Sequence, residues 1–109
     1  MTPRDEIPLG TFEEQVMLAV LRAGGDAFGM AVRREIETVT GRDIAVGAVY
    51  ATLDRLEAKR LVTSKRAAPG GVSRRLFSVT RAGAQALEES RAMRDELWRG
   101  VNLRPLLGS

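Results

Sequence analysis

VGAVYATLDRLEAKRLV, residues 46–62, is typical of an amphipathic helix that continues directly into a β-strand. Its large apolar side chains recur every three or four positions and therefore share one helical face: Val46, Val49, Tyr50, Leu53 and Leu56. The opposite face is small at its beginning and basic at its end, and carries Gly47, Ala48, Ala51, Thr52, Arg55 and Lys59. A helix that lies against a polyanion needs little bulk where base edges approach and cations where phosphates lie. An ordinary core helix with a solvated outer face would show the same pattern, so the neighbouring segments decide between the two.

A basic hairpin follows this helix. Residues 61–66 and 74–79 have the composition of β-strands, and the turn-rich sequence AAPGGVS joins them. Both stems are basic, with Lys65 and Arg66 before the loop and Arg74 and Arg75 after it, and Ser73 is the last residue of the loop. A basic ribbon alone is usually a solvated surface, but one placed directly after a small-faced helix is typical of a nucleic-acid contact.

Three further helices are predicted. Thr11 and Glu14 form a capping-box pattern before a helix that ends near Ala23, and a second helix spans about residues 29–40. Thr80 is the expected N-cap of a long last helix, about residues 81–99, and residues 102–109 are expected to be frayed. Three helices followed by a hairpin is the order of a winged helix-turn-helix. We therefore predict a mainly α-helical fold with a small β-hairpin, in which residues 9–80 form the DNA-binding domain and residues 81–101 a C-terminal dimerisation helix.

Composition and charge narrow the function. The 109 residues contain neither cysteine nor histidine, which excludes thiol nucleophiles, histidine bases and zinc sites of those ligands, and we see no catalytic or metal constellation. We expect no enzyme activity, no cofactor and no membrane span, and a cytoplasmic location. Residues 41–81 hold nine of the 17 basic residues but only three of the 14 acidic ones. This local basic block favours a directed contact with a polyanion.

The sequence resembles the PadR family of bacterial transcriptional regulators, winged-helix proteins that act mostly as repressors. The segments that carry the resemblance are residues 9–21, 27–30, 47–57, 61–62 and 74–83. Within them, Gly47-x-x-Tyr50-x-x-Leu53-x-x-Leu56 and Thr80-x-x-Gly83 are the most specific. The sequence departs from the family pattern in two places: Arg60 stands where glycine is usual, and Leu76-Phe77 where two tyrosines are usual.

The resemblance implies a homodimeric, sequence-specific DNA-binding repressor that pairs through its C-terminal helix. The spacing of Ala86, Ser90, Met93, Leu97 and Val101 is close to that of a coiled-coil seam, with Trp98 beside it. We expect Phe12, Met93, Leu97, Trp98 and Val101 to form the dimer core, or a pocket at its centre for a small aromatic effector. For Tyr50 a core role with its hydroxyl at the rim is favoured over a DNA contact.

The expected DNA contacts are Gly47, Ala48, Ala51, Thr52, Arg55, Lys59, Lys65, Arg66, Ser73, Arg74 and Arg75. Arg55 could pair with a nearby acid instead, and at least one hairpin cation is expected only to solvate the ribbon. The partner is then double-stranded DNA with a palindromic operator, whose half-sites lie one helical turn, about 34–36 Å, apart. The main alternative is a winged-helix module that binds another protein without binding DNA, and a sensor that chiefly binds small molecules is compatible with repression.

Overall fold

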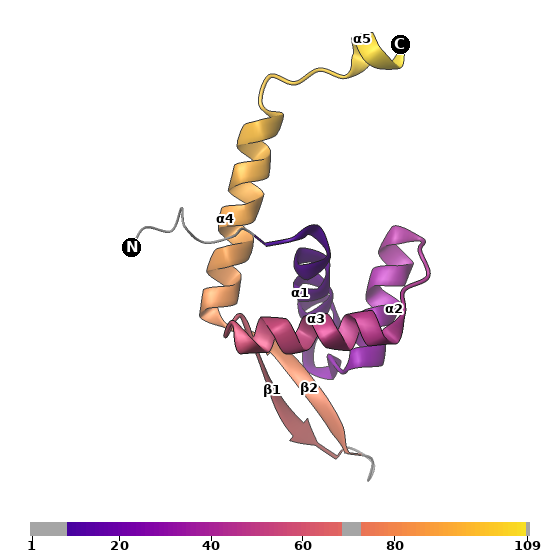
Figure 1. The fold of residues 1–109 in the computed structure, drawn as a ribbon, viewed down its shortest axis with the longest axis vertical. Helices are drawn as coiled ribbons and strands as arrows, with labels where there is room; N and C mark the ends of the chain where they lie inside the picture. The colour runs from indigo at the N-terminus through magenta and orange to yellow at the C-terminus, as the bar shows by residue number, and fades with distance from the viewer. Residues whose placement is uncertain (1–8, 69–72, 109) are drawn as a thin grey trace.

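The computed structural model describes residues 9–68 and 73–108. Three helices, α1 (Thr11–Ala23), α2 (Gly29–Thr40) and α3 (Val46–Ala58), precede a hairpin of β1 (Val62–Ala67) and β2 (Arg74–Val79). A short 3₁₀ turn, η2 (Gly24–Asp26), links α1 to α2, and the chain ends in α4 (Arg81–Trp98) and α5 (Arg104–Leu107). This is the predicted winged helix-turn-helix with a long C-terminal helix (Figure 1).

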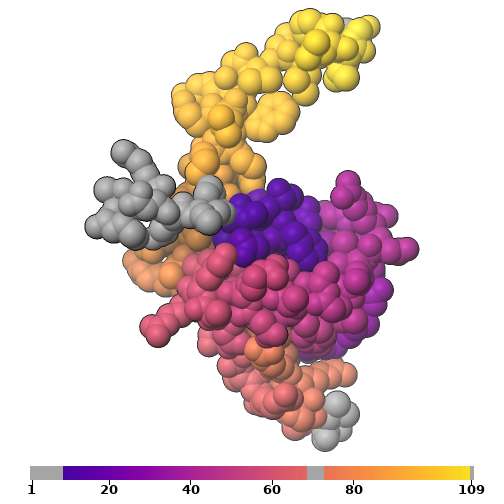
Figure 2. Space-filling view, viewed as in Figure 1, coloured from indigo at the N-terminus to yellow at the C-terminus, as the bar shows by residue number. Residues whose placement is uncertain are grey.

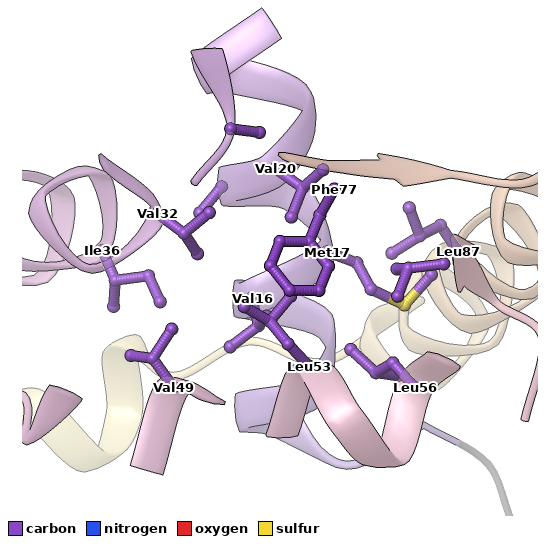
Figure 3. Packing of buried hydrophobic residues seen from close by; sticks show 13 residues of the cluster. Val16, Met17, Val20, Val32, Ile36, Val49, Leu53, Leu56, Phe77 and Leu87 are labelled. Atoms are coloured by element: carbon purple, nitrogen blue, oxygen red, sulfur yellow. The ribbon is translucent and has the colours of Figure 1, made fainter. Parts of the chain in front are cut away.

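One apolar core joins the three helices to the hairpin. Figure 3 shows Met17 and Val20 of α1 and Leu53 and Leu56 of α3 around the ring of Phe77, which β2 contributes. Phe77 is only 2% exposed. The ring therefore lies where a tyrosine hydroxyl would need a buried hydrogen-bond partner, which accounts physically for phenylalanine at this position.

α1 starts one residue earlier than the capping pattern predicts. Gly10 is the N-cap, and its amide donates to the Glu13 carboxylate at 3.0 Å, so Thr11 is the first helical residue and Glu13 replaces Glu14 as the capping acid. The shift matters because it leaves the Glu14 side chain available to α4. Glu14 forms an ion pair with Arg94 there.

The turn between α2 and α3 is held by two side chains of α2. Gly41 ends α2 in the left-handed conformation, at φ 70°. Arg33 then donates to the backbone carbonyl of Ile44 at 2.6 Å, and Glu37 accepts from the Ile44 amide at 2.8 Å. These bonds fix the backbone just before Val46 and so determine where α3 begins.

The exit of α3 is a Schellman motif with an unusual residue. The Leu61 amide bonds to the Leu56 carbonyl and the Arg60 amide to the Glu57 carbonyl, the two bonds that define this motif. Arg60 takes the left-handed position at φ 63°, where glycine is the usual residue because a Cβ is unfavourable there. The departure from the family pattern at Arg60 is therefore a backbone strain as well as an added charge.

Thr80 and Gly83 attach α4 to this exit. The Thr80 hydroxyl donates to the Arg60 carbonyl at 2.8 Å and accepts from the Gly83 amide at 3.0 Å, as the predicted N-cap should. A Cβ on Gly83 would overlap the Leu61 carbonyl oxygen. The Thr80-x-x-Gly83 motif thus allows the start of α4 to pack closely against the start of the hairpin.

β1 and β2 pair antiparallel, from Val62 opposite Val79 to Ala67 opposite Arg74. We call this hairpin the wing. The Phe77 amide also donates to the Ala27 carbonyl at 2.9 Å, so the linker before α2 is hydrogen-bonded to β2. The predicted loop residues 69–72 lie outside the described residues.

The C-terminal segment leaves the rest of the chain. α4, α5 and the link between them, which we call the arm, begin beside the base of the wing and extend away from it, so that α5 lies at the end of the molecule opposite to the wing (Figures 1 and 2). The predicted frayed tail in fact contains a short helix, α5, which Pro105 helps to begin and which Gly108 ends. All side chains from Arg91 to Gly108 are exposed.

Candidate nucleic-acid interface

The outward face of α3 is narrower than the sequence predicted. Gly47, Ala48, Ala51 and Arg55 are exposed, as expected. Thr52 is only 1% exposed, so its assignment to the outer face is wrong. The buried positions of α3 are Val49, Thr52, Leu53 and Leu56, a spacing that turns the helix so that Thr52 replaces Tyr50 on the inner face.

Thr52 affects the surface indirectly. Its hydroxyl accepts a hydrogen bond from Nη2 of Arg55 at 3.0 Å, so a buried side chain orients an exposed guanidinium. Tyr50 is 37% exposed, and its ring lies where a Cβ on Gly29 would be. The tyrosine therefore packs against the first turn of α2 at the rim of the core.

Lys59 lies at the end of α3 and forms an ion pair with Glu13 of α1 at 2.8 Å. Burial raises the pKa of Glu13, but the hydrogen bonds from Lys59 and from the Gly10 amide outweigh it, so the pKa lies below its usual value. Lys59 thus fastens α3 to α1, and its ammonium already has a carboxylate partner.

The wing carries two kinds of cation. Two of these cations, Lys65 and Arg66, are exposed, as is Ser73, the residue before Arg74. The guanidinium of Arg74 lies 4.2 Å from the centre of the Phe28 ring. Within residues 9–68 and 73–108, no carboxylate forms an ion pair with Lys65, Arg66 or Arg74. These three cations can therefore meet a phosphate without giving up a carboxylate of the described chain.

Arg75 differs from its neighbour. Its guanidinium forms ion pairs with Asp54, at 2.9 Å, and with Glu57, both on α3. It also lies 4.8 Å from the centre of the Phe77 ring. The sequence grouped Arg75 with the free wing cations, but the structure directs it inward, to the side of the wing that faces α3.

One member of the surface was missed by the sequence analysis. Arg34 of α2 lies 5.7 Å from the centre of the Phe28 ring, the same ring that Arg74 contacts. Phe28 is the N-cap residue of α2 and thereby brings cations of α2 and of the wing to one place. The sequence pattern marks Arg34 only as a solvated helix position, because nothing in it reveals that β2 returns to this point.

The residues assigned to the dimer or pocket fall into two groups. Phe12 is partly buried and packs against the apolar core described above. Met93, Leu97, Trp98 and Val101 lie on the arm and are 49%, 72%, 58% and 51% exposed. An apolar groove of about 190 Å³ lies elsewhere, between α1 and α2, where Leu18 and Val39 line it.

Residues 9–68 and 73–108 contain no group of three or more aspartate or glutamate side chains placed to hold a metal ion. No helix within those same ranges has the length and apolarity that crossing a bilayer requires.

Comparison with known proteins agrees with this geometry. The sequence model described as "Transcriptional regulator PadR-like family" matches residues 17–89. The chain is 41% identical over 61 residues to "Transcriptional regulator Rv3488" of Mycobacterium tuberculosis, a match that covers 56% of this chain and 57% of that regulator. The matched part is thus little more than half of that relative's length.

Solved structures show the same fold. A PadR family transcriptional regulator from Eggerthella lenta superposes with a TM-score of 0.65 and 27% identity, over 84% of this chain and 80% of that one. F93 from STIV, described as a winged-helix DNA-binding protein, superposes with a TM-score of 0.66 and 21% identity, over 86% of this chain and 99% of that one.

Proposed function

We propose a mode of DNA binding from the premise that this chain belongs to the PadR-like family of transcriptional regulators. In this proposal α3 enters the major groove of double-stranded DNA, the wing lies over the neighbouring phosphates, and a homodimer holds two such units on a palindromic operator in the cytoplasm. Binding represses transcription. One observation carries the proposal: a single winged-helix unit combines a small, exposed face of α3 with cations on α3 and the wing, Arg55, Lys65, Arg66 and Arg74, that have no carboxylate partner in the described chain.

The front of α3 suits base recognition. Gly47, Ala48 and Ala51 leave the backbone accessible, so base edges can approach closely. Ala45 precedes the helix without a side-chain cap, and the first turn carries no acid. The Ala48 amide donates to the Ala45 carbonyl at 3.0 Å, but the amides of Val46 and Gly47 before it can donate to a DNA phosphate.

The flanks of α3 suit backbone contacts. Arg55 lies on the outward face, and Lys65, Arg66 and Arg74 extend the positive surface onto the wing. Arg34 adds a cation beside Arg74. Arginine presents a planar fork that matches phosphate oxygens, so it is well suited to this task. Thr52, Lys59 and Arg75 are better assigned to holding α3 and the wing in place.

The arm suits self-association. Its exposed apolar residues follow the predicted seam, and a second copy related by a two-fold axis would cover the same residues in both subunits. Two Trp98 rings near the centre of such a dimer would offer a flat apolar site, which supports a small aromatic effector as the ligand.

Salt-dependent DNA binding tests the proposal. An operator is first selected from random duplexes with the wild-type protein, and the dissociation constant is then measured from 50 to 200 mM salt. Arg74→Ala should weaken binding to operator and scrambled duplexes alike, and should lower the salt slope by about one, because one phosphate contact is lost. Ala48→Ser and Ala51→Ser should instead change which operator sequence is preferred.

Matched variants make the result decisive. Arg91→Ala removes an exposed arginine from the C-terminal half of α4, the helix that runs away from the wing (Figure 1), and should leave the slope unchanged. Failure of the wild-type protein to select any duplex would contradict DNA recognition and favour the protein-interaction module. An unchanged slope in Arg74→Ala would remove the wing from the interface.

A further inference from the structure

We propose that Arg75 is a positioning residue that fixes the angle between the wing and α3 and thereby sets operator specificity, without contacting DNA itself. The inference rests on the proposed function, because it concerns how the two DNA-binding elements are held together. It assigns neighbouring arginines to opposite tasks: Arg74 faces the ligand, and Arg75 faces the protein.

The contacts of Arg75 join three elements. Nη1 donates to Asp54 at 2.9 Å and Nη2 donates to Glu57, so both ends of the guanidinium are held by α3. Nε donates to the Ser64 hydroxyl of β1 at 3.2 Å, and that hydroxyl in turn donates to Glu57 at 2.7 Å. A single side chain of β2 is thus bonded to α3 directly and through β1.

The position of Arg75 along the wing explains why these hydrogen bonds control the orientation of the wing. Two antiparallel strands alone are marginally stable, so the wing needs attachment to the rest of the protein. Phe77 anchors its base in the core, and Arg75 lies two residues nearer the tip on the same face of β2. Arg75 is therefore the charged contact by which the outer part of the wing is held to α3.

Charge keeps Arg75 in this place. Its side chain is 32% exposed and lies between two carboxylates, whereas Arg74 has none in residues 9–68 and 73–108. The Ser64 hydrogen bond and the Arg75 guanidinium lower the pKa of Glu57, and Asp54 and Glu57 raise the pKa of Arg75, so Glu57 and Arg75 both stay charged at neutral pH. Reaching a phosphate would require Arg75 to leave both carboxylates unpaired beside DNA.

The two roles predict opposite results when the partners of Arg75 are removed. In D54N/E57Q the arginine is intact but its carboxylates are gone. A positioning role predicts that the ratio of operator to scrambled-duplex affinity falls by about tenfold, because the wing is no longer fixed on α3. A phosphate-contacting role predicts tighter binding to every duplex with that ratio preserved.

A charge-balanced variant separates geometry from electrostatics. R75M/E57Q removes one positive and one negative charge, so the net charge of the surface is unchanged. We expect its salt slope to equal that of the wild type while the affinity ratio falls by about tenfold. R74A is the matched control, for which the slope falls and the ratio holds. R75K keeps the charge but lacks the planar fork, and its ratio should lie between those of the wild type and R75M/E57Q.

A slope lowered by about one in R75M/E57Q, with the ratio unchanged, would overturn the inference and return Arg75 to the phosphate contacts. Thermal unfolding of R75M, E57Q and the double variant, measured without DNA, should show non-additive changes that confirm the contact. Additive changes would also overturn the inference. If the wild type showed no sequence preference, the proposed function would be overturned instead. The unfolding measurements do not involve DNA, so they test the Arg75 contact separately from the proposed function.

Discussion

The body, residues 9–80, and the arm use apolar side chains in opposite ways. In the body, Leu53 and Phe77 are 0% and 2% exposed and lie in one core (Figure 3). In the arm, Leu97 and Leu106 are 72% and 84% exposed. The last buried side chain of α4 is Leu87, so the change occurs within a single helix.

The difference separates two sources of stability. Burial of the inner face of α3 fixes its orientation within one subunit, so the candidate DNA surface needs no partner to form. The arm exposes the apolar side chains of Met93, Leu97, Trp98 and Val101, and the proposed dimer would cover them. We therefore expect mutations in the arm to change association, and mutations in the body to change folding or recognition.

Removal of the outer arm should have the largest effect. A chain ending at Glu89 keeps Gly83 and Leu87, the buried residues of α4, and loses the ion pair between Arg94 and Glu14 of α1. We expect it to fold as a monomer and to bind the operator about 10²–10⁴-fold more weakly, because two linked half-sites no longer act together. Sedimentation equilibrium and DNA titration measure the two changes.

A point variant sharpens this prediction. Leu97→Asp should also give monomers, since it places a charge in the proposed seam, whereas Ala92→Asp, an exposed position on the other side of α4, should remain dimeric. A dimer that survives both the truncation and Leu97→Asp would locate the interface on the body.

The junction between body and arm should be the next most sensitive point. Gly83→Ala would place a methyl group against the Leu61 carbonyl, a backbone atom that cannot move without displacing the start of β1. We expect a loss of about 2–3 kcal/mol in the free energy of unfolding, measured by urea denaturation. Gly47→Ala is the control, because a Cβ there meets open space. Equal stability of the two variants would show that the junction is not tightly packed.

The comparison also shows what the sequence could predict. The helices, the hairpin and Thr80 as an N-cap follow from local patterns, and the structure confirms them. Thr52 was misplaced because both candidates fit a helical period: Tyr50 lies three positions before Leu53, and Thr52 lies four positions before Leu56. Only tertiary packing selects between Tyr50 and Thr52. Helix propensity and hydrophobic period describe one helix at a time. They carry no information on which side chain of a neighbouring element packs against a given position of that helix.

The cations of the site show the same limit. Arg74 and Arg75 are indistinguishable in composition, yet one contacts Phe28 and the other Asp54. Strand alternation predicts that they point to opposite faces, but the carboxylates that meet Arg75 come from a different element. The same holds for Lys59 and Glu13, which are 46 residues apart in the sequence.

A substitution that stabilises the fold should have a smaller effect than the truncation of the arm or Gly83→Ala. Arg60→Gly should raise the free energy of unfolding by about 1 kcal/mol, because the left-handed conformation at φ 63° is unfavourable for arginine and not for glycine. Ala58→Gly, two residues earlier and within α3, should lower it by up to about 1 kcal/mol. Destabilisation by both substitutions would show that the contacts of the Arg60 side chain stabilise the fold by more than its left-handed backbone conformation destabilises it. DNA affinity should change little, apart from a weaker long-range attraction.

Acid should weaken the contact between the wing and α3 by the smallest amount. The Ser64 hydroxyl and the Arg75 guanidinium outweigh burial and lower the pKa of Glu57 below its usual 4.5 in the folded state. This contribution is fully present above the unfolded value and is lost as the pH falls through the lowered pKa. Because the side chain is 31% exposed, we expect it to contribute less than about 1 kcal/mol to the free energy of unfolding.

Glu57→Gln should therefore be less stable than the wild type at pH 7 and equally stable below both pKa values. Ser64→Ala should reproduce part of this difference, since it removes the hydrogen bond that lowers the pKa most. A gap between wild type and Glu57→Gln that stays constant down to pH 2 in urea titrations would mean that packing, and not the charge of Glu57, holds the outer wing to α3.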